Sequence, residues 1–204
     1  MNIRINQNEI KVIKIGERSY PKKLQYIYAP PKILYVLGND KILNHEAIAM
    51  IGCRDCSEYG KKVAYQFAQA FAKKDVIVIS GLARGIDTYA HKGVVSAKGK
   101  TIAILGCGLD VIYPPENIEL YKQILQNDGA IISEYPLGEK PLKQHFPARN
   151  RIISGLSDGV LVVEAKERSG TLITVEHALE QGKDVYAVPR KYIKQTITRN
   201  QWIN

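Results

Sequence analysis

Long hydrophobic runs are absent from this 204-residue sequence. No uninterrupted apolar stretch approaches the roughly 20 residues that a membrane-spanning helix needs. The first eight residues also lack the apolar centre of a signal peptide. We therefore expect a protein that neither enters nor spans a membrane and that resides in the cytoplasm.

Cysteine is scarce, with three residues in the chain. Three thiols cannot build a disulfide framework, and an odd number of free thiols suits a reducing compartment. Cys53 and Cys56 form a C-x-x-C pair at the start of an expected helix, which leaves thioredoxin-like redox chemistry as a minor alternative. No second such pair and no nearby pair of histidines completes a zinc site, so we expect no metal.

The sequence also lacks a complete nucleotide-phosphate loop. Gly60-Lys61-Lys62 misses the spacing of a Walker motif, and Lys62 stands where serine or threonine would hold magnesium. Gly106-Cys107-Gly108 begins like a dinucleotide fingerprint, but Leu109-Asp110 breaks the pattern. We expect neither ATP hydrolysis nor a bound cofactor.

What the chain does contain is the composition of an ordinary globular protein, 45% hydrophobic and 24% charged. Its length suffices for a full core. Lysine and arginine number 29 against 20 acidic residues, which gives a net charge of +9. A basic surface attracts polyanions, so nucleic acid is the first partner to consider, although the same excess is also found where it serves solubility alone.

Short runs rich in valine and isoleucine alternate with amphipathic segments. The runs read as strands buried on both faces, at residues 47–51, 76–80, 101–105, 130–133, 160–163 and 184–188. The segments between them predict helices at residues 57–74, 87–98, 116–126 and 171–181. This order predicts an α/β fold, with a doubly wound, mainly parallel sheet and helices on both faces. We assign residues 1–44 to a leader of strands and turns packed on the core, 45–189 to the main domain and 190–204 to a basic tail.

Ligands of such sheets bind beyond the carboxyl ends of the strands. Gly52-Cys53-Arg54 leaves the first of these strands and enters a helix, so backbone N–H groups and an arginine face one opening. Ser169-Gly170-Thr171 opens the last helix and offers further donors. Helix N-termini attract phosphate, which makes both segments candidate anion sites.

The segment 138–151 surrounds one aromatic ring, Phe146, with five basic residues: Lys140, Lys143, His145, Arg149 and Arg151. Cations that follow a phosphate backbone and a ring that stacks on a base are typical of single-strand binding. The alternative is structural, with Phe146 in the core and Arg149 paired to Glu134 or Glu164. We expect one of the two arginines to be structural and the other to contact the ligand. Pro147 predicts an extended backbone at Phe146.

Asp87 and His91 lie four residues apart on one helix face. They could act as acid and base or bind a metal. Such pairs more often make structural hydrogen bonds, and we favour that interpretation.

Several motifs occur in a fixed order from Tyr20 to Pro189. They are Tyr20-Pro21, Pro30-Pro31, Ile51-Gly52-Cys53-Arg54, Ser80-Gly81-Leu82-Ala83-Arg84-Gly85-Ile86-Asp87, Ala90-His91, Gly108-Leu109-Asp110, Tyr113-Pro114, Ser133-Glu134-Tyr135-Pro136, the run from Phe146 through Arg149-Asn150-Arg151 to Gly159, Val163-Glu164-Ala165, Ser169-Gly170-Thr171 and Ala187-Val188-Pro189. In this combination the chain resembles the DprA/Smf family of bacterial DNA-processing proteins.

The resemblance implies a Rossmann-like domain that binds DNA without catalysis. It implies capture of incoming single-stranded DNA during natural transformation, protection of that strand, transfer to a RecA-type recombinase, and self-association as a homodimer. Arg54 corresponds to a DNA-contacting arginine of the family, and Lys143 and Phe146 keep the spacing of two further contacts. The expected DNA-binding set is Gly52, Arg54, Lys143, Phe146, Arg149, Arg151, Ser169, Gly170 and Thr171, with no catalytic residue.

Two alternatives remain. One is a nucleotide-binding or nucleotide-hydrolysing enzyme similar to LOG proteins, although Leu172 and Ile173 occupy the positions where that family carries its acid. The other is a truncated, inactive DprA paralogue. After Pro189 the chain departs from the family pattern, and residues 190–204 hold neither the usual glycine-rich turn nor a winged-helix domain.

Overall fold

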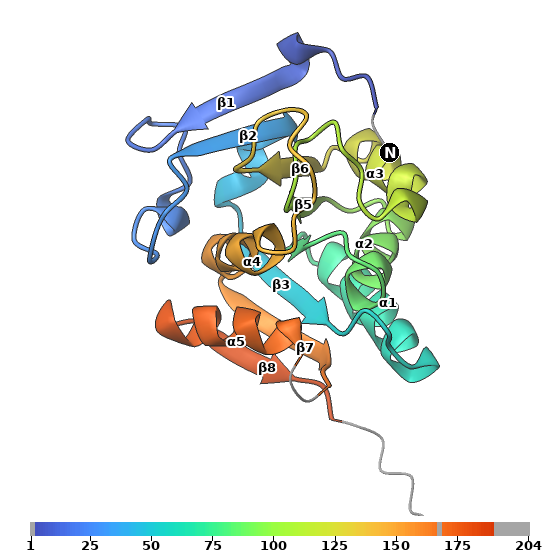
Figure 1. Cartoon of the computed structure of the whole chain (residues 1–204). Coiled ribbons are helices and arrows are strands. Elements are labelled where there is room, and N and C mark those ends of the chain that lie inside the picture. Colours follow the sequence, from blue (N-terminus) through green and yellow to red (C-terminus); the bar gives the residue numbers. More distant parts are fainter. Residues whose placement is uncertain (1–2, 167–168, 190–204) are drawn as a thin grey trace, which may run out of the picture.

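The computed structural model describes residues 3–166 and 169–189. They form one eight-stranded sheet with the order β1-β2-β6-β5-β4-β3-β7-β8 (Figure 1). The strands are β1 (Ile10–Lys14), β2 (Ile33–Gly38), β3 (Ala47–Gly52), β4 (Ile77–Ser80), β5 (Thr101–Leu105), β6 (Ala130–Ser133), β7 (Gly159–Glu164) and β8 (Asp184–Ala187). The six strands from β3 to β8 are parallel, as the sequence predicts, and each lies within one residue of its expected bounds at either end.

The leader contributes strands to the sheet itself. β2 pairs antiparallel with β6, with Tyr35 opposite Ser133, and β1 pairs antiparallel with β2. The first 44 residues therefore cover the β6 edge of the parallel sheet, an edge whose backbone N–H and C=O groups would otherwise lack partners.

Five helices cover the sheet in the part of the chain that the structure describes. They are α1 (Glu58–Ala72), α2 (Ile86–Ser96), α3 (Ile118–Gln126), α4 (His145–Leu156) and α5 (Gly170–Glu180). α1, α2 and α3 lie on one face, and α4 and α5 lie on the other (Figure 1). The predicted doubly wound α/β architecture is confirmed.

The order of the strands creates a switch point. The chain runs outward from β3 through β4 and β5 to β6, then returns to place β7 on the other side of β3. The connections after β3 and β7 therefore depart to opposite faces, which opens a crevice between the carboxyl ends of these two strands. In open α/β sheets this crevice is the usual ligand site.

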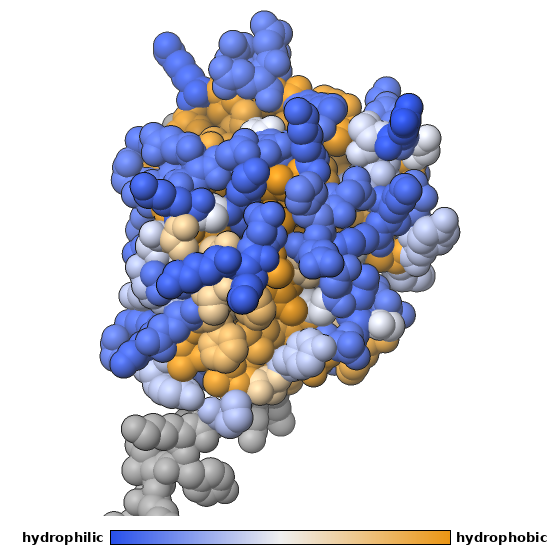
Figure 2. All heavy atoms as spheres, turned by 180° about the vertical axis from the view of Figure 1, so that it is seen from behind, coloured by the Kyte–Doolittle hydropathy of each residue, from blue (hydrophilic) through white to orange (hydrophobic). Residues whose placement is uncertain are grey.

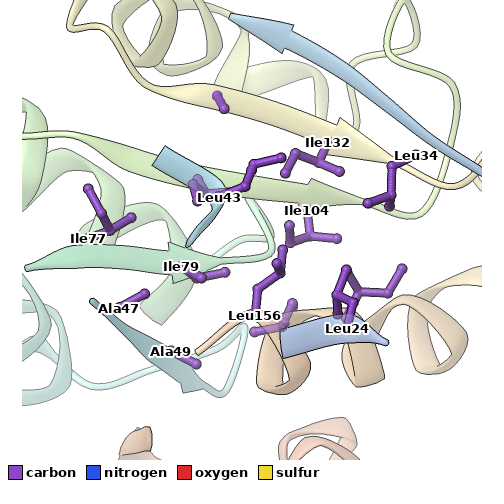
Figure 3. Close-up of a cluster of buried hydrophobic side chains, with 14 of the residues drawn as sticks. Leu24, Leu34, Leu43, Ala47, Ala49, Ile77, Ile79, Ile104, Ile132 and Leu156 are labelled. Carbon is purple, nitrogen blue, oxygen red and sulfur yellow. The ribbon is translucent and has the colours of Figure 1, made fainter. Parts of the chain in front are cut away.

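The largest hydrophobic cluster fills the space between the sheet and α4. Leu156 of α4 and Leu24 of the short 3-10 turn Lys22–Leu24 lie against Ile79, Ile104 and Ile132 of the strands (Figure 3). Two further clusters, around Ile86 and Leu109, pack the opposite face.

Hydrophilic side chains cover much of the side of the molecule turned away in Figure 1, with hydrophobic atoms visible between them (Figure 2). No helix among the described residues combines the length and apolarity needed to cross a membrane.

One local expectation is wrong. Phe146 is helical rather than extended, since α4 begins at His145 and places Pro147 in its first turn. Proline is tolerated there because the backbone N–H groups of a first turn have no intrahelical acceptor.

Asp87 and His91 do not pair with each other. Asp87 accepts hydrogen bonds from the backbone N–H of Gly81 at 3.1 Å and of Ala83 at 3.3 Å. His91 contacts the Thr101 hydroxyl through Nδ1 at 2.8 Å, and that hydroxyl donates to the Val78 carbonyl. Nδ1 must therefore carry the proton. The structural interpretation of this pair is confirmed.

His91 is held neutral. Its Nε2 is buried without a hydrogen-bond partner among the described residues, so a second proton would have no acceptor. Burial, assisted by the charge of Arg149, lowers the pKa of His91 from 6.5 to about 3.

Acid should therefore destabilise the fold through His91. Between pH 6.5 and pH 3 the unfolded chain binds a proton at this residue and the folded chain does not, so stability falls as the pH falls through that range. Lowering the pH from 7 to 5 should cost about 2 kcal/mol from this residue alone. Urea unfolding at both pH values should show this loss in the parent and a clearly smaller one in His91→Gln. The exposed His45→Gln is the matched control, and equal losses in all three proteins would contradict the assignment.

Candidate nucleic-acid interface

A cavity of about 760 Å³ opens at the switch point, beyond the carboxyl ends of β3 and β7. Eight of the nine residues in the expected DNA-binding set line it: Gly52, Arg54, Lys143, Phe146, Arg149, Ser169, Gly170 and Thr171. They come from three separate segments of the chain, which the fold brings together. Arg151 alone of the set does not line the cavity.

The loop after β3 forms one wall. Gly52 packs so tightly that an added Cβ would lie 2.4 Å from Cγ1 of Ile86 and 2.8 Å from the Glu164 carbonyl, so a larger residue is excluded. The Cys53 N–H donates to that carbonyl at 2.8 Å. These contacts fix the loop and leave Arg54 exposed, with its guanidinium 5.2 Å from the ring centre of Phe146. A cation over an aromatic face is attracted by the ring.

The N-terminus of α5 forms the opposite wall. No atom of the described residues lies within 4 Å of where a Cβ of Gly170 would be, which leaves the backbone there open to ligand atoms. The hydroxyl oxygen of Ser169 is buried and has no partner among the described residues. Lys166, which sequence reasoning missed, also lines the cavity and forms an ion pair of 2.5 Å with Asp55 across the opening. No sequence pattern identified this single lysine as part of a binding site.

Arg149 forms the floor and is structural. Its side chain is buried, and Nη1 donates to the carbonyls of Gly81, at 2.7 Å, and of Ile104. Nη2 lies 4.0 Å from the Asp87 carboxylate. Burial raises the pKa of Asp87, and the guanidinium opposes that shift. An added Cβ on Gly81 would lie 2.2 Å from the guanidinium, so glycine is required beside it.

Arg151 lies on the outer side of α4 and also has partners within the protein. It donates to both carboxylate oxygens of Glu134, at 2.8 and 2.7 Å, and to the Ala29 carbonyl at 2.8 Å. The alternative that paired Glu134 with Arg149 is therefore wrong, because Arg151 holds that carboxylate. The structure shows neither arginine with the free guanidinium that we expected of one of them.

The N-terminus of α1 is already occupied by a carboxylate of the chain. Glu164, at the end of β7, accepts hydrogen bonds from the Ser57 N–H at 3.1 Å and from the Ser57 hydroxyl at 2.7 Å. An added Cβ on Gly60 would lie 2.0 Å from Oε2 of Glu164. The N-terminus of α1 is therefore closed to an external anion, whereas no described residue bonds the buried Ser169 hydroxyl at the start of α5.

The thiols of Cys53, which lines the cavity, and of Cys56 show no sign of activation. Burial, followed by the charge of Glu164, raises the pKa of Cys53 to about 11 and shifts that of Cys56 in the same direction. Reactive cysteines have lowered pKa values instead, so the geometry argues against redox chemistry. Among the described residues, no cluster of histidine, cysteine or acidic side chains could hold a metal ion.

The fold and this cavity define a Rossmann-like domain with a basic ligand site at its switch point. Comparison with known proteins gives the family: the sequence profile of DNA recombination-mediator protein A matches residues 11–204, and the chain belongs to this family. The resemblance to DprA/Smf proteins predicted from the motifs is thereby confirmed.

Comparisons with individual proteins support the same family assignment. DNA processing protein DprA of Streptococcus pneumoniae is 49% identical over 170 residues, which cover 83% of this chain and 60% of that protein. The X-ray structure of DprA from the same species superposes with a TM-score of 0.85 at 44% identity, over 92% of this chain and 67% of that one. DNA processing protein A of Helicobacter pylori, solved to describe its single-stranded DNA binding mode, gives a TM-score of 0.82 at 31% identity, over 91% and 83%. The chain spans about 60% of the length of the curated DprA proteins of S. pneumoniae and Bacillus subtilis.

Arg149 should be required for folding. Arg149→Leu leaves two carbonyls and the Asp87 carboxylate buried without their donor, and should lower the free energy of unfolding by about 3–5 kcal/mol. Arg54→Leu removes an exposed cation and should cost less than about 1 kcal/mol. Urea unfolding of both variants tests this difference, and losses of similar size would show that Arg149 does not anchor the floor.

Proposed function

We propose that this protein is a non-enzymatic, single-stranded DNA-binding mediator of recombination. It captures incoming DNA in the switch-point cavity, protects it and helps to load a RecA-type recombinase during natural transformation. It acts in the cytoplasm as a homodimer. The observation that carries the proposal is the convergence of eight expected DNA-binding residues, from three segments, on one cavity. The DNA-binding mode described for the H. pylori relative supports it.

The binding mechanism is electrostatic capture followed by stacking. Arg54 and Lys143 stand at the cavity as exposed cations, and the open N-terminus of α5 adds backbone donors for a phosphate. The net charge of +9 concentrates polyanions around the protein. The ring of Phe146 lies beside Arg54 at the same cavity, where a base can stack. None of these contacts reads a base edge, so binding should be largely independent of sequence.

A nucleotide-hydrolysing function is the weaker candidate. Glu164 occupies the helix N-terminus where Rossmann-like nucleotide-binding proteins hold a pyrophosphate, and its charge opposes a second anion there. Leu172 and Ile173 supply no acid at the start of α5, and Ile173 lines the cavity. A mononucleotide that competes as well as an oligonucleotide of equal phosphate content would reverse this preference.

The exposed cations should contribute directly to affinity. Arg54→Ala combined with Lys143→Ala should weaken binding of an oligo-dT strand. The slope of log affinity against log salt should fall by about 0.7 for each phosphate that the variant no longer neutralises. Titrations by fluorescence anisotropy at three or more salt concentrations measure both quantities.

The matched control removes one arginine and one lysine elsewhere. Arg18→Ala with Lys74→Ala changes the net charge equally at exposed positions outside the cavity, and should preserve most of the affinity. Equal losses in the two double variants would reduce the effect to general charge and eliminate this site. Comparing single-stranded with duplex DNA in the same titrations tests the preference for single strands.

A substitution of Phe146 distinguishes stacking on a base from packing in the hydrophobic core. Its side chain is half-buried and touches Arg54 and Tyr113, and it belongs to none of the core clusters of the described residues. Phe146→Ala should therefore cost roughly 1–3 kcal/mol in single-strand binding, and less in stability than the roughly 3–5 kcal/mol of a core phenylalanine. A large drop in melting temperature with unchanged DNA affinity would remove Phe146 from the interface.

A further inference from the structure

The loop at residues 25–31, between the 3-10 turn Lys22–Leu24 and β2, carries the two most exposed aromatic rings among the described residues. Tyr26 is 89% exposed and Tyr28 is 84% exposed. Among the same residues neither hydroxyl makes a hydrogen bond and neither ring stacks on another. We propose that this tyrosine loop is a second contact site for single-stranded DNA, on which bases stack where the strand leaves the switch-point cavity. The inference rests on the proposed binding of single-stranded DNA.

The tyrosine loop is firmly attached although its two rings are exposed. Ile27, between the two tyrosines, is 7% exposed and belongs to the largest hydrophobic cluster. The buried Tyr20 donates its hydroxyl hydrogen to the Pro31 carbonyl at 2.8 Å. Nε of Arg151 donates to the Ala29 carbonyl, also at 2.8 Å. Rings on a loop that is already fixed lose little conformational entropy when a base stacks on them.

The backbone of the same loop is strained at Ala29. Its φ of 50° lies in the left-handed region, which favours glycine over a residue with a Cβ. Strain of this kind persists where the surrounding structure imposes it, and it is concentrated at functional sites. Ala29 directly follows Tyr28, so the constraint acts on the backbone that carries the second ring.

Helix α4 joins the cavity to the tyrosine loop. Phe146 near its start and Ile153 near its end both line the cavity. Gly155, two residues further on, faces the loop, since an added Cβ would lie 3.1 Å from Cγ2 of Ile27. Figure 1 shows α4 beside the segment that leads from β1 to β2. The helix has 12 residues and a length of about 18 Å, which about five nucleotides span at roughly 3.4 Å each.

Two lysines supply the charge that a phosphate backbone needs at the loop. Lys22 precedes the loop and Lys32 follows it, and both residues are exposed. Neither forms an ion pair among the described residues. Glu134 is already paired with Arg151 at 2.7 Å, so its charge offers a passing phosphate little repulsion. Aromatic rings flanked by unpaired cations are typical of a surface that binds single strands.

Strand length separates the two contact sites. An oligo-dT of about 5 nucleotides can occupy the cavity alone, whereas one of about 20 nucleotides also reaches the loop. Tyr26→Ala with Tyr28→Ala should weaken binding of the longer strand at least about 5-fold, the loss expected when one base no longer stacks on a ring. Binding of the shorter strand should equal that of the parent. Arg54→Ala with Lys143→Ala should weaken binding of both strands, measured by fluorescence anisotropy.

Further substitutions test whether the rings stack. Tyr26→Phe with Tyr28→Phe should bind the longer strand nearly as the parent does, because stacking needs the ring and not the hydroxyl. Tyr26→Leu with Tyr28→Leu keeps apolar bulk without an aromatic face and should lose nearly as much as the alanine variant. Phe67→Ala is the matched control, since it removes a ring that is 43% exposed on α1, at the opposite face of the sheet. Melting temperatures show whether any loss of affinity follows from a loss of folding.

The two lysines are tested through the salt dependence. Lys22→Gln with Lys32→Gln should lower the salt slope for the longer strand by about 0.7 for each phosphate no longer neutralised. The slope for the shorter strand should not change. Lys73→Gln with Lys74→Gln removes two exposed lysines after the end of α1 and is the control of equal charge.

Photocrosslinking locates the strand directly. In an oligo-dT of about 20 nucleotides, single thymidines are replaced in turn by iododeoxyuridine, whose excited base couples to an aromatic ring stacked on it. Mass spectrometry of the digested complex should find a crosslink at Tyr26 or Tyr28. The shorter strand should give no crosslink in this loop.

The outcomes distinguish this inference from the proposed function. If the alanine and leucine variants of the loop bind the longer strand as the parent does, while Arg54→Ala with Lys143→Ala weakens binding, the loop contacts a protein partner and not DNA, and the inference is refuted. Equal losses for both strand lengths in the loop variants would also refute it, because the loop would then support the cavity. If the phenylalanine variant loses as much as the alanine variant, stacking is refuted. If no variant, including Arg54→Ala with Lys143→Ala, alters affinity, the proposed function itself fails.

Discussion

The buried guanidinium of Arg149 is the interaction on which the site depends. One side chain of α4 ties together the carboxyl ends of β4 and β5, through the carbonyls of Gly81 and Ile104, and approaches Asp87 at the start of α2. Asp87 in turn fixes the backbone of the loop after β4. A planar group with five donors suits this task, because it can satisfy several buried acceptors at once. Without it, α4 would have no polar attachment to these two strand ends.

The position of Phe146 follows from that attachment. It lies three residues before Arg149, hence about one helical turn away, and the anchored helix presents it at the cavity. The stack of His145 on Tyr135, with centroids 3.9 Å apart, fixes the first turn of the same helix. A stacking residue held on a rigid element loses little conformational entropy when it meets a base. Arg54, exposed at the same cavity, lies in the loop after β3 rather than on a helix.

The parallel strands could be predicted from the sequence because each is a short apolar run bounded mostly by glycine or charged residues. Residues 101–105 and 130–133 match their strands at both ends. The strand order did not follow from such patterns, since it depends on which edges pair across the whole domain. The antiparallel addition of β1 and β2 to β6 was missed for the same reason.

At the site, residue types were predictable and their roles were not. Glycines and arginines at strand ends identified the cavity, yet opposite sides of one helix place Arg149 inside the protein and Arg151 on Glu134. A sequence motif identifies a residue of the site, but only the packing shows whether that residue supports the site or contacts the ligand. Lys166 belongs to no motif, because its place at the cavity depends on where the fold brings the end of β7.

Glu164 determines whether the N-terminus of α1 can bind an anion from solution. A carboxylate at the end of β7 acts as a built-in anion for the first helix of the domain and keeps that helix from recruiting one from solution. A phosphorylated ligand must therefore find its donors elsewhere at the cavity, such as the backbone at the start of α5.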